Sequence, residues 1–273
     1  MAELYLREDL AKLWSPEEAF GRARALTGEV YRELAGRRTL RVMLGERVYF
    51  AKLHSGVGWR EIFKNLMTAR LPVTGARNEF RTCRHLEAQG VSAPRVAAFG
   101  QVGANPASRF SFVICDALEG YESLEDITER WELSPPSPSE KRRLIEAVAH
   151  FAKAMHRSGV IHRDFYICHL FAEITAYARG EVRLAVIDLH RAQIHMEIPQ
   201  RWLLRDLAAL LFSTLDLGLD SRAWFRFIRI YRARPLQEVF AEEGDFWRNV
   251  YQRALALYQK GERKGLVNGR FRR

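Results

Sequence analysis

The chain has 273 residues, of which 48% are hydrophobic and 11% aromatic, a composition that supports a full hydrophobic core and excludes a disordered protein. Lys and Arg number 43 against 33 Asp and Glu, and the formal charge of +10 predicts attraction to polyanions. The longest apolar run, residues 207–212, is too short to cross a bilayer, and the first residues lack the pattern of a secretory signal. We therefore expect a cytoplasmic globular protein.

Three cysteines, Cys83, Cys115 and Cys168, are widely spaced and form no CxxC pair. An odd number of cysteines at such spacing disfavours both a disulfide framework and a zinc site. We expect all three to be reduced.

Short strands dominate the first part of the chain. Residues 29–34, 39–44 and 47–54 read as strands joined by turns at 35–37 and 45–46, which predicts a three-stranded antiparallel meander. A helical pattern follows over residues 75–89, with Gly90 and Pro94 as its stop, and residues 110–115 (FSFVIC) read as a buried strand.

Helices dominate the second part. Residues 134–139 (SPPSPS) form a loop with Ser139 as the predicted N-cap, and the helix that follows ends at Gly159. Its core-facing stripe consists of Leu144, Val148, Phe151 and Met155. A short strand pair is expected around residues 182–187. The predicted fold is α+β, with a small antiparallel lobe and one main helix in residues 1–116 and a larger helical lobe in residues 117–273.

Two segments resemble the catalytic loop and the metal-binding loop of the protein-kinase fold. Residues 160–170 read VIHRDFYICHL, with the triplet His162, Arg163 and Asp164, and residues 184–191 read LAVIDLHR. Phosphoryl transfer needs a carboxylate that orients and deprotonates the acceptor hydroxyl, which is the role expected of Asp164. It also needs a metal ligand at the end of an apolar strand, which is the role expected of Asp188.

His169 lies where most kinases have asparagine as the second metal ligand. Magnesium prefers oxygen ligands, so His169 is expected to be a weaker nitrogen ligand, to favour manganese, or to bind phosphate directly. An isolated HRD triplet is a weak signal, and a lone histidine is more often a core residue than a ligand. The order of HRD, His169 and a buried strand that ends in Asp188 carries the prediction.

A kinase-like first lobe must also supply a strand lysine for the nucleotide phosphates and a helix acid to pair with it. Lys52 shares a strand face with Val48 and Phe50, which favours a site lysine over an exposed lysine that protects a sheet edge. Glu79 shares a helix face with Cys83 and Leu86 and is preferred to Glu61 as the acid.

Other contacts to the nucleotide are less clearly marked. No GxGxxG loop is present, so the turn at residues 35–37, helped by Arg37 or Arg38, is expected to cover the phosphates. Asp116 lies where the segment between the lobes would meet adenine. Asp206, at the start of an apolar helix, either holds the backbone of the catalytic loop or is a charge favoured by the helix dipole.

The segments HRDFYICHL, DLHRA and RDLAALLFS together resemble the lipopolysaccharide core heptose kinases, and the similarity extends over most of residues 20–220. His169 and the DLH triplet fit the pattern of that family. The resemblance implies an enzyme that uses ATP and Mg2+ to phosphorylate heptose I of the lipopolysaccharide inner core. It also implies a Gram-negative source and a location at the cytoplasmic face of the inner membrane.

The charge distribution fits such an acceptor. Residues 221–273 hold 13 Lys and Arg and 5 Asp and Glu, a net charge of +8 that leaves +2 for the rest of the chain. On a helix, Arg222, Arg226 and Arg229 would lie opposite an aromatic face that packs on the helical lobe. We expect this region to bind the anionic acceptor or the inner-membrane surface, or an acidic protein such as acyl carrier protein.

Three other functions stay open on the residues alone. A kinase for an aminoglycoside or choline would share Asp164 but usually needs an acidic acceptor pocket. A pseudokinase or a nucleic-acid binding module would explain the basic charge. However, Lys52, Asp164 and Asp188 are all present and no nucleic-acid binding motif is found, so we expect no nucleic-acid partner. A protein kinase is disfavoured because no activation segment is recognisable.

Overall fold

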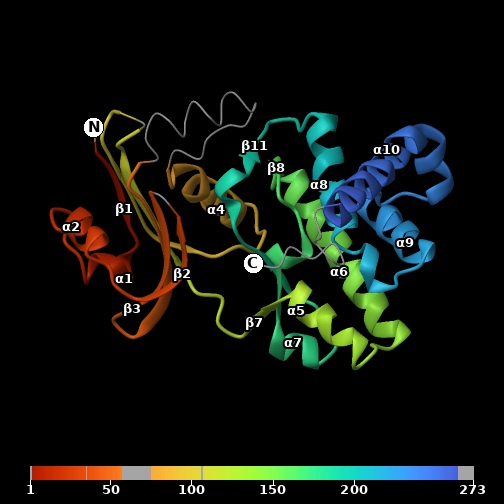
Figure 1. Cartoon of the computed structure of the whole chain (residues 1–273), viewed down its shortest axis with the longest axis horizontal. Coiled ribbons are helices and arrows are strands. Elements are labelled where there is room, and N and C mark those ends of the chain that lie inside the picture. Colours follow the sequence, from red (N-terminus) through yellow and green to blue (C-terminus); the bar gives the residue numbers. More distant parts are fainter. Residues whose placement is uncertain (1, 35, 57–74, 106, 264–273) are drawn as a thin grey trace. The chain divides into compact units, whose positions relative to one another are not determined.

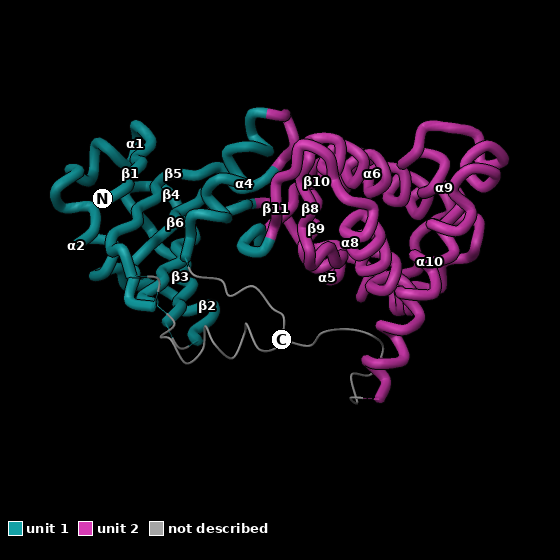
Figure 2. Tube along the Cα trace, turned by 90° about the horizontal axis from the view of Figure 1, so that it is seen from above, with its two compact units in different colours: residues 1–88, 93–119, 188–191 teal, residues 89–92, 120–187, 192–273 magenta. Residues whose placement is uncertain are grey.

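The structure is a computed structural model that describes residues 2–34, 36–56, 75–105 and 107–263 (Figure 1). These residues form two compact units (Figure 2). Unit 1 comprises residues 1–88, 93–119 and 188–191, and unit 2 comprises residues 89–92, 120–187 and 192–273. Two short segments, 89–92 and 188–191, thus belong to a different unit from the residues on either side of them.

Unit 1 is built on a six-stranded sheet in which all neighbouring strands are antiparallel, in the order β1-β5-β6-β4-β3-β2. The strands are β1 (Glu3–Leu6), β2 (Glu29–Leu34), β3 (Arg37–Leu44), β4 (Arg47–His54), β5 (Val96–Val102) and β6 (Phe110–Asp116). The predicted meander is present as β2, β3 and β4. The sequence analysis did not anticipate β1 and β5, which together extend the sheet on the other side of β6.

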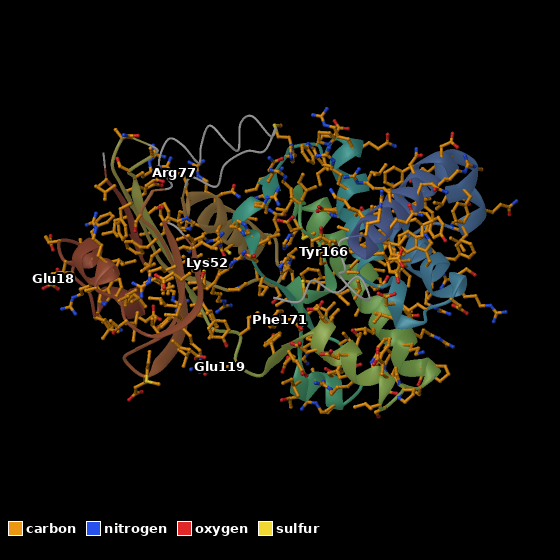
Figure 3. The ribbon with its side chains drawn as sticks, viewed as in Figure 1. Glu18, Lys52, Arg77, Glu119, Tyr166 and Phe171 are labelled. Carbon is orange, nitrogen blue, oxygen red and sulfur yellow. The ribbon has the colours of Figure 1, made fainter. Side chains whose placement is uncertain are left out.

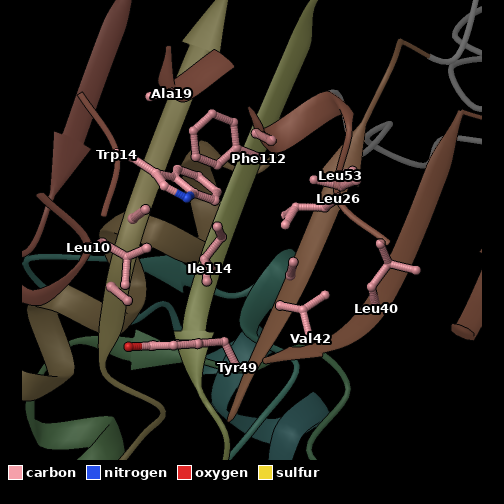
Figure 4. Packing of buried hydrophobic residues seen from close by; sticks show 14 of the residues in the cluster. Leu10, Trp14, Ala19, Leu26, Leu40, Val42, Tyr49, Leu53, Phe112 and Ile114 are labelled. Atoms are coloured by element: carbon pink, nitrogen blue, oxygen red, sulfur yellow. The ribbon is translucent and has the colours of Figure 1, made fainter. Parts of the chain in front are cut away.

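Successive side chains of β4 point alternately to the two faces of the sheet. Tyr49, Ala51 and Leu53 are buried in a cluster that covers one face of the sheet (Figure 4). Two short helices, α1 (Glu8–Ala11) and α2 (Ala19–Arg24), contribute Leu10 and Ala19 to this cluster. Lys52 therefore points to the other face, as period two requires.

The other face of the sheet is covered by α4 (Arg77–Ala88). Phe80 of this helix stacks on Phe99 of β5, with ring centroids 4.3 Å apart. The helix buries Glu79, Thr82, Cys83 and Leu86. The face that Glu79, Cys83 and Leu86 were predicted to share is thus the buried face of the helix. The Glu79 carboxylate therefore lies between the helix and the sheet.

Unit 2 is mostly helical. Its helices are α5 (Leu124–Glu129), α6 (Pro138–Arg157), α7 (Ile174–Ala178), α8 (Gln200–Phe212), α9 (Ser221–Arg232) and α10 (Leu236–Glu262). Short strands pair as β7 (Tyr121–Ser123), β9 (Leu170–Glu173) and β10 (Leu184–Val186), and as β8 (Val160–Ile161) with β11 (Gln193–Ile194). The 3-10 turns are η1 (Arg130–Glu132), η2 (Ile167–His169) and η4 (Leu215–Leu217), while η3 (Leu189–Arg191) belongs to unit 1. A small antiparallel sheet and a larger helical part confirm the predicted fold class.

Two local predictions in unit 2 need correction. The N-cap of α6 is Ser137 rather than Ser139, because Ser137 and Glu140 form a capping box and Pro138 fits the first helical position. The expected strand pair around residues 182–187 is a single strand, β10, and its partner β9 follows directly after the catalytic-loop segment. In the described part of the chain, no helix is long and apolar enough to span a membrane.

Candidate active site

Lys52, labelled in Figure 3, donates hydrogen bonds to two carboxylates of unit 1. Its Nζ donates to Oε1 of Glu79 at 2.7 Å and to Oδ1 of Asp188 at 2.9 Å. Burial alone would lower the pKa of Lys52, but the charges of Glu79 and Asp188 raise it above its ordinary value. The lysine therefore stays charged although its side chain is only 14% exposed. The sequence predicted all three residues for the site, and the fold brings them together.

Two further nitrogen atoms besides Lys52 Nζ lie near Oδ1 of Asp188. His190 Nδ1 lies 2.7 Å from Oδ1, and an Arg37 nitrogen lies 3.7 Å from the same atom. Burial alone would raise the pKa of Asp188, but the charge of Lys52 and the hydrogen bond from His190 lower it well below its ordinary value. Asp188 has a positive φ of 59°, a conformation rare for residues other than glycine and typical of functional positions. The sequence analysis assigned no role to His190, although it follows Asp188 by only two residues.

Arg37 and Arg38 have different surroundings. Arg37 was expected in the turn at residues 35–37, but it is the first residue of β3. Arg37 pairs in register with His54 and faces Asp188, with its side chain 14% exposed. Arg38 points to the opposite face of the strand and lies 3.3 Å from Glu33. The structure thus brings Arg37, and not Arg38, to the Lys52 side of the sheet.

Asp116 ends β6, and its side chain is already engaged. Both of its oxygens accept hydrogen bonds from the Arg7 guanidinium, at 2.6 and 2.8 Å, and Arg7 also binds Asp9. The backbone N–H of Asp116 donates to the carbonyl of Arg95. The sequence predicts this position near adenine, whereas the pairing of Asp116 with Arg7 could not be predicted from it.

Unit 2 carries the catalytic-loop segment, and Asp206 of α8 holds its backbone. Asp206 Oδ2 accepts from the N–H of His162 at 2.6 Å, and Oδ1 accepts from the N–H of Arg163 at 2.8 Å. Asp206 is 1% exposed and is the seventh residue of α8, so the alternative of a charge at the helix N-terminus is wrong. Arg163 has a φ of 72°, and these two hydrogen bonds stabilise this strained backbone.

Hydrogen bonds fix the tautomers of two histidines around Asp164. His162 Nε2–H donates to the carbonyl of Ile187 at 2.8 Å, and its Nδ1 accepts from the N–H of Asp164 at 3.3 Å. His169 Nδ1–H donates to the carbonyl of Asp164 at 2.7 Å. The lone pair of the His169 ring therefore lies on Nε2, which is the arrangement of a histidine that binds a metal or accepts a hydrogen bond. The rings of His162 and His169 stack with centroids 5.3 Å apart.

Two buried polar side chains, His156 and Tyr231, lie next to Asp206. His156 Nε2 lies 3.5 Å from Asp206 Oδ2, and His156 Nδ1 lies 2.8 Å from the hydroxyl of Tyr231. Burial raises the pKa of Tyr231, so the phenol keeps its proton. From the sequence, the aromatic face of α9 was expected only to pack on the helical lobe, and His156 was overlooked, because a contact between residues 75 positions apart leaves no local pattern.

The predicted site residues thus form one group in each unit. Unit 1 holds Lys52, Glu79, Arg37 and Asp188, whereas unit 2 holds the catalytic-loop group His162, Arg163, Asp164 and His169. Within the residues that the structure describes, no group of three or more His, Cys, Asp or Glu side chains is arranged to hold a metal ion. Glu61, the alternative to Glu79, lies outside the described residues.

Comparison with known proteins gives a consistent result. The model of the lipopolysaccharide kinase (Kdo/WaaP) family matches residues 22–231. The lipopolysaccharide core heptose(I) kinase WaaP of Pseudomonas aeruginosa is 45% identical over 96% of this chain and 98% of its own length. The enzyme of the same name from Escherichia coli K12 is 40% identical over 96% of this chain and 99% of its own length.

A solved structure, WaaP in complex with acyl carrier protein, superposes with a TM-score of 0.81 at 40% identity. The match covers 94% of this chain and 99% of that chain. The family model spans well over half of the sequence, and both curated relatives match nearly end to end. The chain belongs to the lipopolysaccharide kinase (Kdo/WaaP) family.

Proposed function

We propose that this chain is an ATP-dependent kinase that phosphorylates a hydroxyl of heptose I in the lipopolysaccharide inner core. The observation that carries this proposal is the buried Lys52 held between Glu79 and Asp188, an arrangement suited to nucleotide phosphates. The identity of 45% and 40% to lipopolysaccharide core heptose(I) kinases supports the choice of acceptor.

In this proposal Asp164 is the catalytic base. Its carboxylate takes the proton of the acceptor hydroxyl as the oxygen forms a bond to the γ-phosphorus and the bond to the β-phosphate breaks, which releases ADP. Lys52 and Arg37 bind phosphate oxygens on the sheet side. Asp206 keeps the backbone next to Asp164 in place, and His162 anchors the residue before Asp188.

The side chains proposed for the metal have suitable chemistry. Asp188 is held in its ionised form, and His169 carries its lone pair on Nε2, so one oxygen and one nitrogen ligand would hold Mg2+, with Mn2+ as the alternative. The bound ion would neutralise charge on the phosphoryl group during transfer.

The proposed partners follow from charge and from the related structure. We propose that the anionic lipopolysaccharide acceptor is met at the cytoplasmic face of the inner membrane, to which a basic chain is attracted. Acyl carrier protein is the proposed protein partner, since the WaaP that resembles this chain was solved in complex with it.

The test is transfer of the γ-phosphoryl group from ATP to heptose-containing core lipopolysaccharide, measured by phosphorus-detected analysis of the product. We expect Asp164→Asn to lower kcat by roughly 10²–10⁴-fold, because general base catalysis is lost. Asp245→Asn, on the exposed surface of α10, is the matched control and should keep full activity. Undiminished transfer by the Asp164 variant would disprove the assignment, and preference for an aminoglycoside or a protein acceptor would disprove the proposed substrate.

A further inference from the structure

Three arginines surround one indole in unit 2. The guanidinium carbons of Arg205, Arg163 and Arg201 lie 4.5, 5.0 and 5.9 Å from the ring centroid of Trp202. Arg201, Trp202 and Arg205 belong to the first two turns of α8, and Arg163 comes from the catalytic-loop segment. We call these three arginines and Trp202 the Trp202 cluster.

The Trp202 cluster concentrates positive charge at an unfavourable place. Arg201 and Arg205 are exposed, and no carboxylate in the described part of the chain forms an ion pair with either of them. Arg201 is the second residue of α8, whose first turn has no acidic residue, and a cation at this end of a helix is disfavoured by the helix dipole. Arg201 and Arg205 are also like charges at i and i+4, which repel. The indole face offsets part of this cost, and a bound anion would offset the rest.

In α9, α10 and the turn between them, several arginines are already paired. Arginines of α9, α10 and the turn between them form ion pairs with carboxylates of the same unit: Arg226 with Glu146, Arg232 with Glu243, Arg234 with Glu242, and Arg248 with Asp245. Positive charge there is partly neutralised within the fold. The Trp202 cluster is therefore the stronger candidate for binding an anion from outside the chain.

The Trp202 cluster is connected to Asp164, the proposed base, through neighbouring residues and two hydrogen bonds. Asp206 follows Arg205 directly, and its carboxylate holds the N–H groups of His162 and Arg163 at 2.6 and 2.8 Å. Asp164 follows Arg163 directly. Helix α8 thus fixes the catalytic loop through Asp206 and presents Arg201 and Arg205 beside it, so an anion on the cluster would lie at a set distance from Asp164.

We propose that Arg201 and Arg205, together with Arg163, bind a phosphate or carboxylate group of the glycolipid acceptor and so position its hydroxyl for Asp164. This inference rests on the proposed function and adds the residues that select an anionic sugar. Arginine suits the task, because its planar fork binds both kinds of oxyanion in a bidentate manner.

The first experiment measures kinetics with a deacylated, water-soluble core acceptor. We expect the double variant Arg201→Gln and Arg205→Gln to raise KM for the acceptor about tenfold or more, with KM for ATP and kcat little changed. The matched control removes two exposed arginines of α6, Arg142→Gln and Arg157→Gln, and should leave all three constants as in the wild type. Equal melting temperatures of the variants exclude a folding defect. An unchanged KM for the acceptor in the first variant overturns the proposal.

A second experiment identifies the anion by removing it from the acceptor. One acceptor is dephosphorylated and another has its carboxyl groups reduced. The wild type should bind one of these two acceptors more weakly than the intact acceptor. For that acceptor the double variant should bind as well as the wild type does, because the change in the acceptor and the change in the protein remove the same contact. If the double variant binds every acceptor more weakly than the wild type by the same factor, the proposal is overturned.

Two further measurements separate this inference from its competitors. Vesicles of phosphatidylcholine and phosphatidylglycerol test whether the arginines bind lipid headgroups. If the double variant binds vesicles more weakly but binds the water-soluble acceptor as the wild type does, the proposal is overturned.

Equilibrium binding of the acceptor to the inactive Asp164→Asn form needs no turnover. If the wild type fails to phosphorylate heptose yet acceptor binding still depends on Arg201 and Arg205, the proposed function fails while the anion site stands.

Discussion

His54 is a buried neutral group among positive charges. It ends β4 on the side of Lys52 and is 3% exposed. Burial, followed by the charges of Arg37, Lys52 and His190, lowers its pKa from an ordinary 6.5 to about 3. The unfolded chain therefore binds a proton on His54 as the pH falls below about 6.5, whereas the folded chain does not until about pH 3. Folding stability is lost across this window as the pH falls.

We expect His54→Gln to make the protein less sensitive to acid. Between pH 7.5 and about pH 4.5, the wild type should lose roughly 2–3 kcal/mol more unfolding free energy than the variant, because only the wild type has this histidine to protonate in the unfolded state. Urea unfolding of both proteins at the two pH values measures the difference. Parallel losses would show that His54 is protonated in the folded protein.

Site residues differ in how well the sequence identifies them. Lys52 and Glu79 can be found because strand and helix periodicity place each on a buried face that an isolated charge would avoid. Asp164 and Asp188 can be found from the spacing of a known motif. His54 lies two residues after Lys52 on the same strand, so its position on the same face could have been predicted. The contact of Arg7 with Asp116 joins residues 109 positions apart and leaves no local pattern.

Helix α8 connects the hydrophobic core of unit 2 with the catalytic loop. Its apolar run of residues 207–212 is buried, and Asp206 directly before it is the buried carboxylate that accepts two backbone hydrogen bonds. The sequence left two roles open for Asp206 because the start of the helix was not known. The observed start at Gln200 places this residue beyond the first turn, where the helix dipole contributes little.

Asp206→Asn should therefore destabilise the protein and lower its activity. An amide has only one oxygen, so one of the two backbone N–H groups would lose its acceptor, at a cost of roughly 1–3 kcal/mol. Thermal unfolding and hydrogen exchange at the amides of His162 and Arg163 measure the effect. Asp220→Asn is the control, since asparagine caps α9 as well as aspartate does. Unchanged exchange at both amides would contradict the role of Asp206.

Strands β2, β3 and β4 were predictable because β-branched and aromatic residues alternate between clear turn signals. Strand β5 was not, since its sequence VAAFGQV contains small residues with low strand propensity. The structure explains one of them, because a Cβ on Gly100 would clash with the ring of Phe112. Close packing against an aromatic ring on the neighbouring strand requires glycine here, a tertiary cause that no local pattern reveals.

The formal charge of +10 is unevenly distributed along the chain. Residues 221–273 carry a net +8, and half of it comes from Lys264, Arg270, Arg272 and Arg273. In the preceding helices several arginines pair with carboxylates of unit 2, so the attraction of this region to anions is smaller than its composition suggests.

Replacing these four C-terminal basic residues with glutamine should weaken binding to anionic vesicles. Each Lys or Arg near a charged membrane contributes about 1 kcal/mol, so we expect at least about a tenfold loss in a sedimentation assay at low salt. Activity on a deacylated, water-soluble acceptor should be retained. Unchanged vesicle binding would show that these four residues do not attract the protein to the membrane.

The passage of the chain between the two units restricts how the protein can be divided. A fragment that ends at Glu119 would contain Lys52 and Glu79 but lack Asp188, which the chain supplies to unit 1 nearly 70 residues later. The isolated fragment would keep a buried lysine with one of its two carboxylates. Split-protein reporters and separate expression of the amino-terminal part would therefore test an incomplete nucleotide site, whereas a circular permutant opened in an exposed loop would preserve it.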